Sequence, residues 1–525
     1  MPSPAPLRAL EPQTVKAMLT DGREVALVDL REELIFSRSH LLWARSIPLS
    51  RLELRFARLV PRKDTRIVLC DDNDGLVERA AKILHAAGYT DIGCLQGGVA
   101  GWEKAKLELF SGVNVPSKAF GEHIEHACHT PNIGPEELDG LMKSGADMVI
   151  VDSRPFDEFQ RGSIPTATNV PGAELVLHIR DIAPSPDTLV VVNCAGRTRS
   201  IIGAQSLINA GIPNKVVALR NGTMGYTLAG LPPDSGETRR YAEPSDKGLT
   251  WAQAAAGQVA RRFGIMQIDE RAMEGLRADT TRTLYLFDVR DPTDYAAGHF
   301  PGATNAPGGQ LVQATDQYAG TLGARIVLID DREVRAVMTA SWLKQMGWRD
   351  VFVMVARGSD KSPSPAPLLG AAPPADRAIK AKALSDLLAH DRATVIDLSL
   401  SPAYRKGHIP GAWFAIRTRM AEALSKITVN GDLVLTSEDG VLAGLAAAES
   451  TRAVRYLSGG NAAWKAAGFD LTTEPRMADE PLDYWPKPYE RPGNTTDAMN
   501  EYLSWEVDLL PRIERDGTTR FSTPI

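Results

Sequence analysis

The chain has few cysteines, no excess of charge of one sign and no long apolar run. Only 4 of its 525 residues are cysteine, and they are not closely paired, which suits a reducing compartment rather than a disulfide framework. The 59 basic and 65 acidic residues leave a net charge of -6, which argues against nucleic acid as the main partner. No apolar stretch approaches the roughly 20 residues that cross a bilayer, and the N-terminal segment lacks the apolar region of a secretory signal. We therefore expect a cytoplasmic protein that binds neither nucleic acid nor membrane.

The chain is too long for one hydrophobic core, and four of its segments repeat one pattern. In each segment a short apolar run ends in an acidic residue, at Asp29, Asp152, Asp288 and Asp397. A second apolar run, a polar loop and an alanine-rich stretch follow. Apolar runs without alternation are typical of strands buried on both faces of a parallel sheet, and their order predicts right-handed crossovers. We predict an α/β protein of four tandem units, each a short, mostly parallel sheet flanked by helices.

Composition places the boundaries between these units. The stretch 361–376 is rich in proline and alanine, which is typical of a linker, and the stretch 120–134 is expected to be a turn-rich connection. The end of the chain has too few apolar residues to fold alone, so we expect it to pack across the units through its aromatic side chains. These side chains are Trp485, Tyr489, Tyr502 and Trp505. The predicted domains are unit one at residues 1–119, unit two at 120–240, unit three at 241–360, the linker at 361–376, unit four at 377–473 and a tail at 474–525.

One loop distinguishes the second unit. Residues 194–200 read Cys-Ala-Gly-Arg-Thr-Arg-Ser, directly after an apolar run and ahead of a helical stretch. An Asp-x-Arg pattern ends the earlier run, and a Gly-His-x-Pro-Gly-Ala turn is best kept at 298–303 in unit three. Together these motifs resemble the rhodanese domain, and the resemblance covers all four units. It implies a thiosulfate sulfurtransferase, which moves sulfane sulfur from an anionic donor to cyanide or a thiol through a cysteine persulfide.

Unit two departs from the rhodanese pattern at two places. Rhodanese loops commonly carry glycine at the fourth position, whereas Gly196 is third here. Ser163 and Thr166 stand where the turn pattern has histidine and glycine. These departures leave the preferred sulfur donor open.

Spacing within the repeats isolates a single thiol at the nucleophile position. Cys194 lies 42 residues after Asp152, and the same spacing leads to Asp330 in unit three and to Asp71 in unit one. In unit four the matching residue is Ser437. Acidic side chains repel an anionic donor, and a hydroxyl cannot form a persulfide. We therefore expect inactive loops in units one, three and four, which brace the active unit or shape access to it.

The residue types around Cys194 suit a reactive thiolate. The thiolate is the nucleophile, so the pKa of this cysteine has to fall below its usual value of about 8.5. Loop N–H groups can converge on the sulfur, and a helix expected to begin near Ser200 directs its positive end there. Arg197 and Arg199 add positive charge that also suits an oxyanion donor. We expect Cys194 as the catalytic residue, with no cofactor and no metal. The expected substrate-binding residues are Ala195, Gly196, Arg197, Thr198, Arg199 and Ser200.

Two other functions share some of these features. Related phosphatases place five residues between cysteine and arginine to hold a tetrahedral phosphate, whereas four separate Cys194 from Arg199. The shorter loop favours sulfur over phosphate. A persulfide carrier or scaffold that does not turn over thiosulfate would use the same thiol, and three inactive loops with an aromatic tail are compatible with it.

Other polar residues have a plainer structural interpretation. Cys70 follows an apolar run and precedes acids, so core packing is expected, with any residual reactivity left open. Asp152 and Arg154 are expected to form an ion pair that holds the fold. The segment 219–226 is expected to be a turn entering a helix, although three side chains there could line a pocket mouth. These are Arg220, Asn221 and Tyr226. The cluster at 123–129 lacks a second ligand pair at a usual spacing for zinc, which argues against a metal. Its members are His123, His126, Cys128 and His129.

Overall fold

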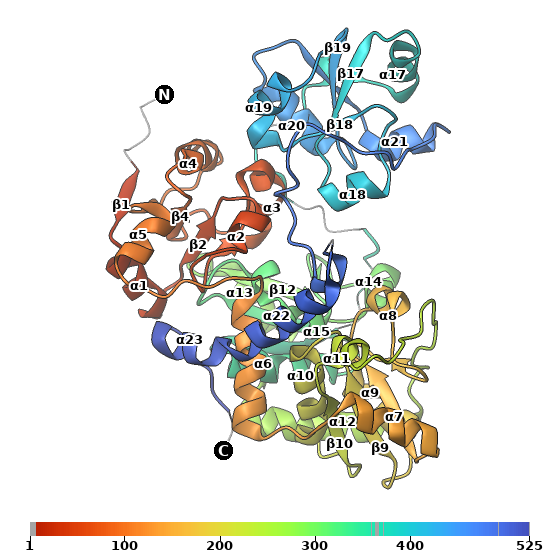
Figure 1. Cartoon of the computed structure of the whole chain (residues 1–525). Helices are drawn as coiled ribbons and strands as arrows, with labels where there is room; N and C mark the ends of the chain where they lie inside the picture. Colours follow the sequence, from red (N-terminus) through yellow and green to blue (C-terminus); the bar gives the residue numbers. More distant parts are fainter. Residues whose placement is uncertain are drawn as a thin grey trace.

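The computed structural model describes residues 7–356, 358, 360–362, 367–370, 372–491 and 493–523. It contains four parallel sheets flanked by helices (Figure 1), as predicted. Three sheets have five strands with the same spatial order, first-fifth-fourth-second-third within each unit, and the fourth sheet adds a sixth strand at its edge. Every pairing between these strands is parallel.

The strands are short, as the apolar runs predicted. Unit one contains β1 (Arg8–Leu10), β2 (Ala26–Asp29), β3 (Arg45–Ser46), β4 (Ile67–Cys70) and β5 (Ile92–Leu95). Unit two contains β6 (Asn132–Ile133), β7 (Met148–Asp152), β8 (Thr168–Asn169), β9 (Leu189–Asn193) and β10 (Val216–Leu219). Unit three contains β11 (Met266–Gln267), β12 (Leu284–Asp288), β13 (Thr304–Asn305), β14 (Arg325–Asp330) and β15 (Val351–Val355). Unit four contains β16 (Ala378–Ile379), β17 (Ala393–Asp397), β18 (Trp413–Phe414), β19 (Asp432–Thr436), β20 (Val454–Leu457) and β21 (Arg476–Met477).

Helices cover both faces of each sheet. Unit one has α1 (Pro12–Thr20), α2 (Glu33–Phe36), α3 (Leu52–Leu59), α4 (Leu76–Ala86) and α5 (Gly98–Lys104). Unit two has α7 (Pro135–Ser144), α8 (Phe156–Arg161), α9 (Leu175–Ile182), α10 (Thr198–Asn209) and α11 (Gly222–Leu228). Unit three follows α12 (Asp246–Phe263) and has α13 (Glu270–Ala278), α14 (Pro292–Ala297), α15 (Gly308–Gln313) and α16 (Arg335–Gln345). Unit four has α17 (Ala381–Leu388), α18 (Ser401–Lys406), α19 (Met420–Ser425), α20 (Val441–Glu449) and α21 (Gly460–Ala466). None of the described helices combines the length and the apolar character that a membrane span requires.

The strand that precedes each nucleophile position lies in the middle of its sheet. β4 and β14 are buried along their whole length, because helices cover both faces and apolar side chains fill both layers. Cys70 ends β4 and is completely buried, which confirms that this thiol packs in the core. Burial is also the main reason that the pKa of Cys70 is raised well above its usual value, so it stays a neutral thiol.

The connection between units one and two is mainly helical, so the expectation of a turn-rich segment at 120–134 was wrong. Helix α6 (Val115–Cys128) begins with a proline in its first turn, which suits a helix start. Its apolar side chains, among them Phe120 and Ile124, are completely buried because the helix packs on α10. The free energy gained by burying this face outweighs the cost of a glycine at position 121 within the helix.

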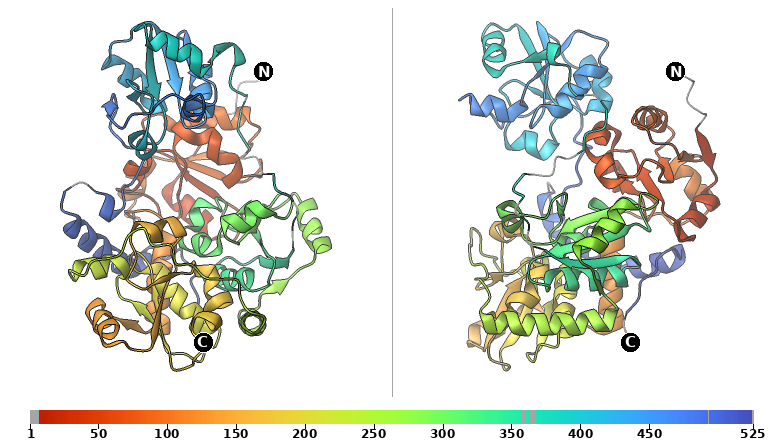
Figure 2. Two further views of the ribbon diagram at one scale, coloured as in Figure 1. Left: turned by 90° about the vertical axis from the view of Figure 1, so that its right-hand side faces the viewer. Right: turned by 180° about the vertical axis from the view of Figure 1, so that it is seen from behind.

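Units two and three share one hydrophobic core. Side chains from both sheets and from α12 belong to a single buried cluster. Trp342 of unit three donates a hydrogen bond to Ser206 at 2.8 Å, and Arg335 pairs with the buried Glu174 at 2.7 Å. Unit four stands at one end of the molecule (Figure 2) and contacts unit one, where the Arg417 guanidinium pairs with Glu53 at 2.8 Å.

The C-terminal segment runs from unit four back across the molecule. It contains the short turn η6 (Pro488–Glu490) and the helices α22 (Thr495–Val507) and α23 (Leu509–Asp516). Both helices contact α6, and α22 also contacts α11 of unit two (Figure 1). This path brings the end of the chain to the side of unit two that carries residues 194–200.

Candidate functional site

The loop of unit two lies at the carboxyl end of a central strand. Cys194 directly follows β9 and is 2% exposed. Helix α10 begins at Thr198, two residues before the expected start at Ser200. The Cys194 thiol donates to Ser200 Oγ at 3.5 Å, and that hydroxyl donates to the Arg197 carbonyl at 2.8 Å. The sulfur therefore faces the first turn of a 12-residue helix, whose positive end stabilises an anion.

Backbone hydrogen bonds fix this loop against the start of α11. The N–H groups of Thr223 and Met224 donate to the carbonyls of Cys194 and Ala195 at 2.8 and 3.0 Å. Gly222 has a φ of +56° and touches the Cys194 carbonyl so closely that no Cβ fits there. The segment 219–226 is thus the turn into a helix that the sequence predicted.

The three side chains of that turn have different roles. Asn221 accepts a hydrogen bond from Arg197 at 3.2 Å, whereas Arg220 binds the exposed Asn132 on the sheet edge. Tyr226 is buried in the core of unit two. Only Asn221 therefore contacts the loop.

The three loops without the thiol show which groups this loop geometry can bind. In unit three both carboxylate oxygens of Asp330 accept loop hydrogen bonds, from the N–H groups of Glu333 and Arg335 at 2.8 Å and of Ala336 at 3.2 Å. Burial raises the pKa of this carboxyl, while the charge of Arg335 and the N–H groups of Ala336 and Glu333 oppose that rise. The loop is therefore a nest of N–H donors in which unit three places its own acidic side chain.

The other two loops without the thiol, in units one and four, repeat one of these bonds. The N–H of the sixth residue after the nucleophile position donates to Asp71 in unit one at 3.1 Å and to Ser437 in unit four at 3.3 Å. The residue at this place in unit two is Ser200. The equivalence confirms the register found from the sequence, and it places the Cys194 sulfur where the other units hold an oxygen acceptor.

Both arginines of the loop are bound to acids. The Arg197 guanidinium pairs with Glu122 at 2.7 Å and with Glu125, both from α6. Arg199 pairs with Glu158 at 2.8 Å. Burial works against ionisation of Glu158, but Arg199 and the nearby lysine of the tail hold the pKa of this carboxyl well below its usual range. An anionic ligand at the loop therefore shares these cations with carboxylates already in place.

The pair of Asp152 and Arg154 is structural, as expected. The two side chains meet at 2.6 Å and are almost completely buried, and Arg154 also donates to the carbonyl of Gly162. Units one and three contain the same pair, with Asp29 and Asp288 as the acids. Because the pair occurs in units without the thiol, it holds the strand end rather than serving chemistry.

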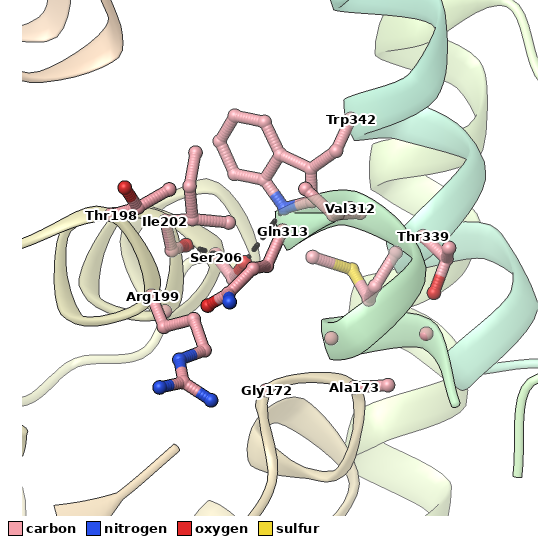
Figure 3. Close-up of a pocket in the computed structure, with 14 residues that line it drawn as sticks. Gly172, Ala173, Thr198, Arg199, Ile202, Ser206, Val312, Gln313, Thr339 and Trp342 are labelled. Carbon is pink, nitrogen blue, oxygen red and sulfur yellow. Dashed lines mark hydrogen bonds between the residues drawn. The ribbon is translucent and has the colours of Figure 1, made fainter. Parts of the chain in front are cut away.

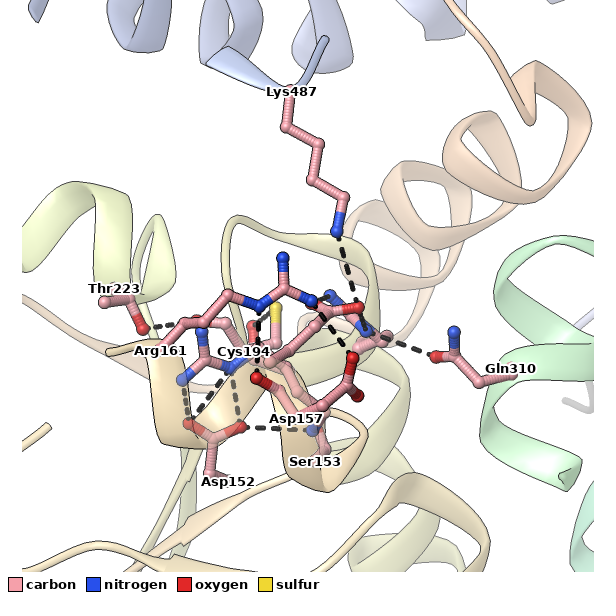
Figure 4. Close-up of polar contacts among 12 residues, drawn as sticks. Asp152, Ser153, Asp157, Arg161, Cys194, Thr223, Gln310 and Lys487 are labelled. Carbon is pink, nitrogen blue, oxygen red and sulfur yellow. Dashed lines mark hydrogen bonds and ion pairs between the residues drawn. The ribbon is translucent and has the colours of Figure 1, made fainter. Parts of the chain in front are cut away.

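A pocket of about 180 Å³ lies over the loop. Its floor is formed by residues 194–199, and Lys118, Glu158 and Gln313 stand around it. The opposite wall comes from the C-terminal segment, and Figure 4 shows Lys487 reaching down toward the loop. The residues of that wall are Tyr484, Trp485, Lys487, Pro488, Tyr489 and Tyr502. The sequence pointed to three of these aromatic residues, but it gave no sign of Lys118, Glu158 or Lys487.

A second, much smaller pocket lies between units two and three (Figure 3). Its volume is about 30 Å³, and its lining includes Ile202, Val312 and Trp342. This volume is enough for one or two water molecules. It is a packing gap in the shared core rather than a substrate site.

The histidine cluster at 123–129 does not assemble a metal site. Across the described part of the chain, no three or more His, Cys, Asp or Glu side chains form a group that could hold a metal ion. His123 instead stacks on Phe120 and lies against Phe521, so it is part of the packing around α6.

Comparison with known proteins identifies the class. The model of the rhodanese-like domain matches residues 11–105, 134–229, 270–358 and 380–467. The chain therefore belongs to the rhodanese-like domain family, which confirms the resemblance. Its structure is similar to the crystal structure of a thiosulfate sulfurtransferase from Pseudomonas aeruginosa, with 45% identity and a TM-score of 0.95 over 99% of this chain and 100% of that one.

Two curated relatives match over part of their length. The 3-mercaptopyruvate sulfurtransferase of Escherichia coli is 27% identical over 29% of this chain and 62% of its own. The HTH-type transcriptional regulator Rv0324 of Mycobacterium tuberculosis is 32% identical over 18% of this chain and 41% of its own. The chain thus spans less than two thirds of these relatives. The family and the two sulfurtransferases support sulfurtransferase as the general class.

Proposed function

We propose that this chain is a thiosulfate sulfurtransferase whose reaction takes place at the loop of unit two. The Cys194 thiolate attacks the sulfane sulfur of thiosulfate, the S–S bond of the donor breaks, and sulfite leaves with the bonding electron pair. Cyanide then attacks the outer sulfur of the resulting persulfide and leaves as thiocyanate, which restores the thiolate. Neither step needs a metal or a cofactor.

The observation that carries this proposal is the internal comparison of the four loops. In unit three the loop N–H groups donate to both oxygens of the Asp330 carboxyl, and in unit two the corresponding side chain is the thiol of Cys194. Amides and a helix N-terminus that stabilise a carboxylate also stabilise a thiolate. The 45% identity to a thiosulfate sulfurtransferase over the whole chain supports the same donor.

In this proposal residues 195–200 bind the donor. Their backbone amides contact the transferred sulfur, and Arg199 binds the sulfonate oxygens in competition with Glu158. Lys487, which lies 3.7 Å from the same carboxylate, adds a second cation to that position. Replacing Glu158 by glutamine removes the competitor, so the KM for thiosulfate should fall.

The donor is tested by measuring sulfur transfer to cyanide from thiosulfate and from 3-mercaptopyruvate with the full chain. The proposal expects the higher kcat/KM for thiosulfate. A clear preference for 3-mercaptopyruvate would contradict it, because pyruvate rather than sulfite would then be the leaving group. A persulfide on Cys194 without release of thiocyanate would favour the alternative, a sulfur carrier that does not turn over. The proposal keeps the cytoplasm as the location, where a reducing environment preserves the thiol.

A further inference from the structure

The C-terminal segment forms one whole wall of the pocket above Cys194. Six of the residues that line this pocket belong to the segment. They come from two stretches, residues 484–491 and 494–507, which we call the cap. Cys194 lies beneath the cap and is 2% exposed, so access to the sulfur passes along these side chains.

The first stretch of the cap is attached to units one and two. The backbone N–H of Trp485 donates to the Glu33 carboxylate at 3.1 Å. This bond attaches the part of the wall that contains Trp485 to unit one. Lys487 reaches Glu158 of unit two at 3.7 Å. Within the stretch, the Tyr484 hydroxyl donates to Glu490 at 2.6 Å. These bonds hold the aromatic side chains over the loop.

The second stretch is attached by a buried ion pair. Glu506 of α22 is completely buried, and its Oε1 lies 3.0 Å from Lys118 Nζ. The same oxygen accepts from the Tyr502 hydroxyl at 3.0 Å and from Thr198 of the loop helix at 3.4 Å. Burial alone lowers the pKa of Lys118, but Glu506 and Tyr502 raise it above its ordinary value, so the ammonium group stays charged.

Side chains of helix α22 pack against the loop at Gly196. A Cβ at Gly196 would lie 2.9 Å from the side chain of Met224 and 3.3 Å from Glu506 Oε2. Among the described residues, that oxygen has no hydrogen-bond partner. A larger residue at this position would require the ends of both side chains to shift. The glycine at the third position of the loop therefore lies at the contact between the loop and the cap.

We propose that the cap is a size filter that limits the sulfur acceptor to small thiophiles such as cyanide or a low-molecular-weight thiol, and that it excludes the cysteines of folded proteins. This rests on the proposed sulfur transfer at Cys194. The pocket volume of about 180 Å³ is below the roughly 300 Å³ of pockets that hold drug-sized ligands. A protein cysteine brings its flanking backbone with it, and the aromatic wall leaves no room for that.

The chemistry that the filter controls is one transfer step. A thiolate RS⁻ attacks the outer sulfur of the Cys194 persulfide, Cys–S–SH. The S–S bond breaks, Cys194 leaves as the thiolate with the electron pair, and the acceptor becomes RS–SH. The attacking sulfur has to approach in line with the breaking bond, so it has to enter the pocket beneath Trp485.

The filter is tested with two acceptors of different size, dithiothreitol and reduced thioredoxin, with thiosulfate as donor. We expect the wild type to use dithiothreitol far better than thioredoxin in kcat/KM. Trp485→Ala should reduce this preference at least about tenfold, because it opens the wall. Tyr489→Ala, at a side chain that is already 39% exposed, should act in the same direction with little risk to folding. The matched control is Trp413→Ala in unit four, outside the pocket, which should leave the preference unchanged.

Equal use of the two acceptors by the wild type would overturn the filter, and so would a preference that survives both substitutions in the cap.

A second measurement separates this failure from failure of the proposed function. Cys194 is alkylated with iodoacetamide and with a maleimide that carries a long polyethylene glycol chain, and the labelled peptide is quantified by mass spectrometry. We expect fast labelling by the small reagent only, and labelling by both in Trp485→Ala. If thiosulfate is not turned over but this labelling pattern holds, the proposed function fails and the size filter stands. Equal labelling by both reagents in the wild type overturns the filter alone.

Discussion

Units two and three have the same fold, but different side chains, a thiol and a carboxyl, occupy the same position in their loops. Both carry a buried Asp–Arg pair at the strand end, and in both the loop opens a long helix. Unit three holds the Asp330 carboxylate in its loop amides, whereas unit two holds the Cys194 thiol. Loop N–H groups thus converge on the acidic side chain in unit three, and the thiol of unit two occupies the same position. In the proposed function this difference decides which of the two units can carry sulfur.

Unit three also supports unit two. The two share a core, and Arg335 from the unit three loop helix pairs with Glu174 of unit two at 2.7 Å. Gln310 of unit three accepts a hydrogen bond from Arg199 at 3.2 Å. The loop helix of unit three is therefore part of the framework around the loop of unit two.

Removing the thiol should have the largest effect. Cys194→Ser should reduce thiosulfate:cyanide transfer by at least about a thousandfold, because a hydroxyl cannot hold the sulfane sulfur. The control is Cys128→Ser, at a half-buried cysteine on α6, which should retain activity. Transfer that survives in Cys194→Ser would mean that the chemistry lies outside unit two.

The second largest effect is expected from replacing the loop arginine, and this effect should differ between units two and three. Arg199→Gln should lower kcat/KM for thiosulfate about a hundredfold, because Glu158 then faces the donor without its cation. The equivalent change in unit three, Arg335→Gln, removes the partner of the buried Glu174 and should lower the melting temperature. Steady-state kinetics and thermal unfolding of both variants test this. Equal kinetic losses at both sites would show that the two loops are not functionally distinct.

The built-in anion of unit three should matter for stability. Asp330→Ala leaves three loop N–H groups without their acceptor, which should cost about 2 kcal/mol of unfolding free energy. Sulfur transfer at temperatures where the variant is folded should be retained. An unchanged melting temperature of Asp330→Ala would contradict a stabilising role for the hydrogen bonds between the loop N–H groups and Asp330.

The smallest expected effect concerns pH. The pKa of Glu158 is lowered in the folded protein, so its ion pair stabilises the fold above the ordinary carboxyl range, and this contribution is lost as the pH falls through the lowered pKa. Glu158→Gln should therefore lower stability by about 1 kcal/mol at neutral pH. The melting temperatures of wild type and variant should converge in acid. A difference between the two melting temperatures that grows as the pH falls would contradict this prediction.

The repeat and the loop could be predicted from the sequence because both are local patterns. Strand runs, the spacing from Asp152 to Cys194 and the burial of Cys70 follow from residues close along the chain. The partners of the loop could not be predicted, because they come from distant segments. Glu506 meets Thr198 across 308 residues. The helix α6 was missed because its evidence is tertiary, an apolar face that is buried only once unit two has folded.

The central claim is tested most directly by locating the transferred sulfur. The full chain is incubated with thiosulfate without an acceptor, and peptides with each of the four cysteines are weighed by mass spectrometry. We predict one added sulfur atom on the peptide with Cys194, lost again on addition of cyanide with release of thiocyanate. An added sulfur on Cys70, Cys94 or Cys128 instead, or none on Cys194, would contradict the assignment of the reaction to unit two.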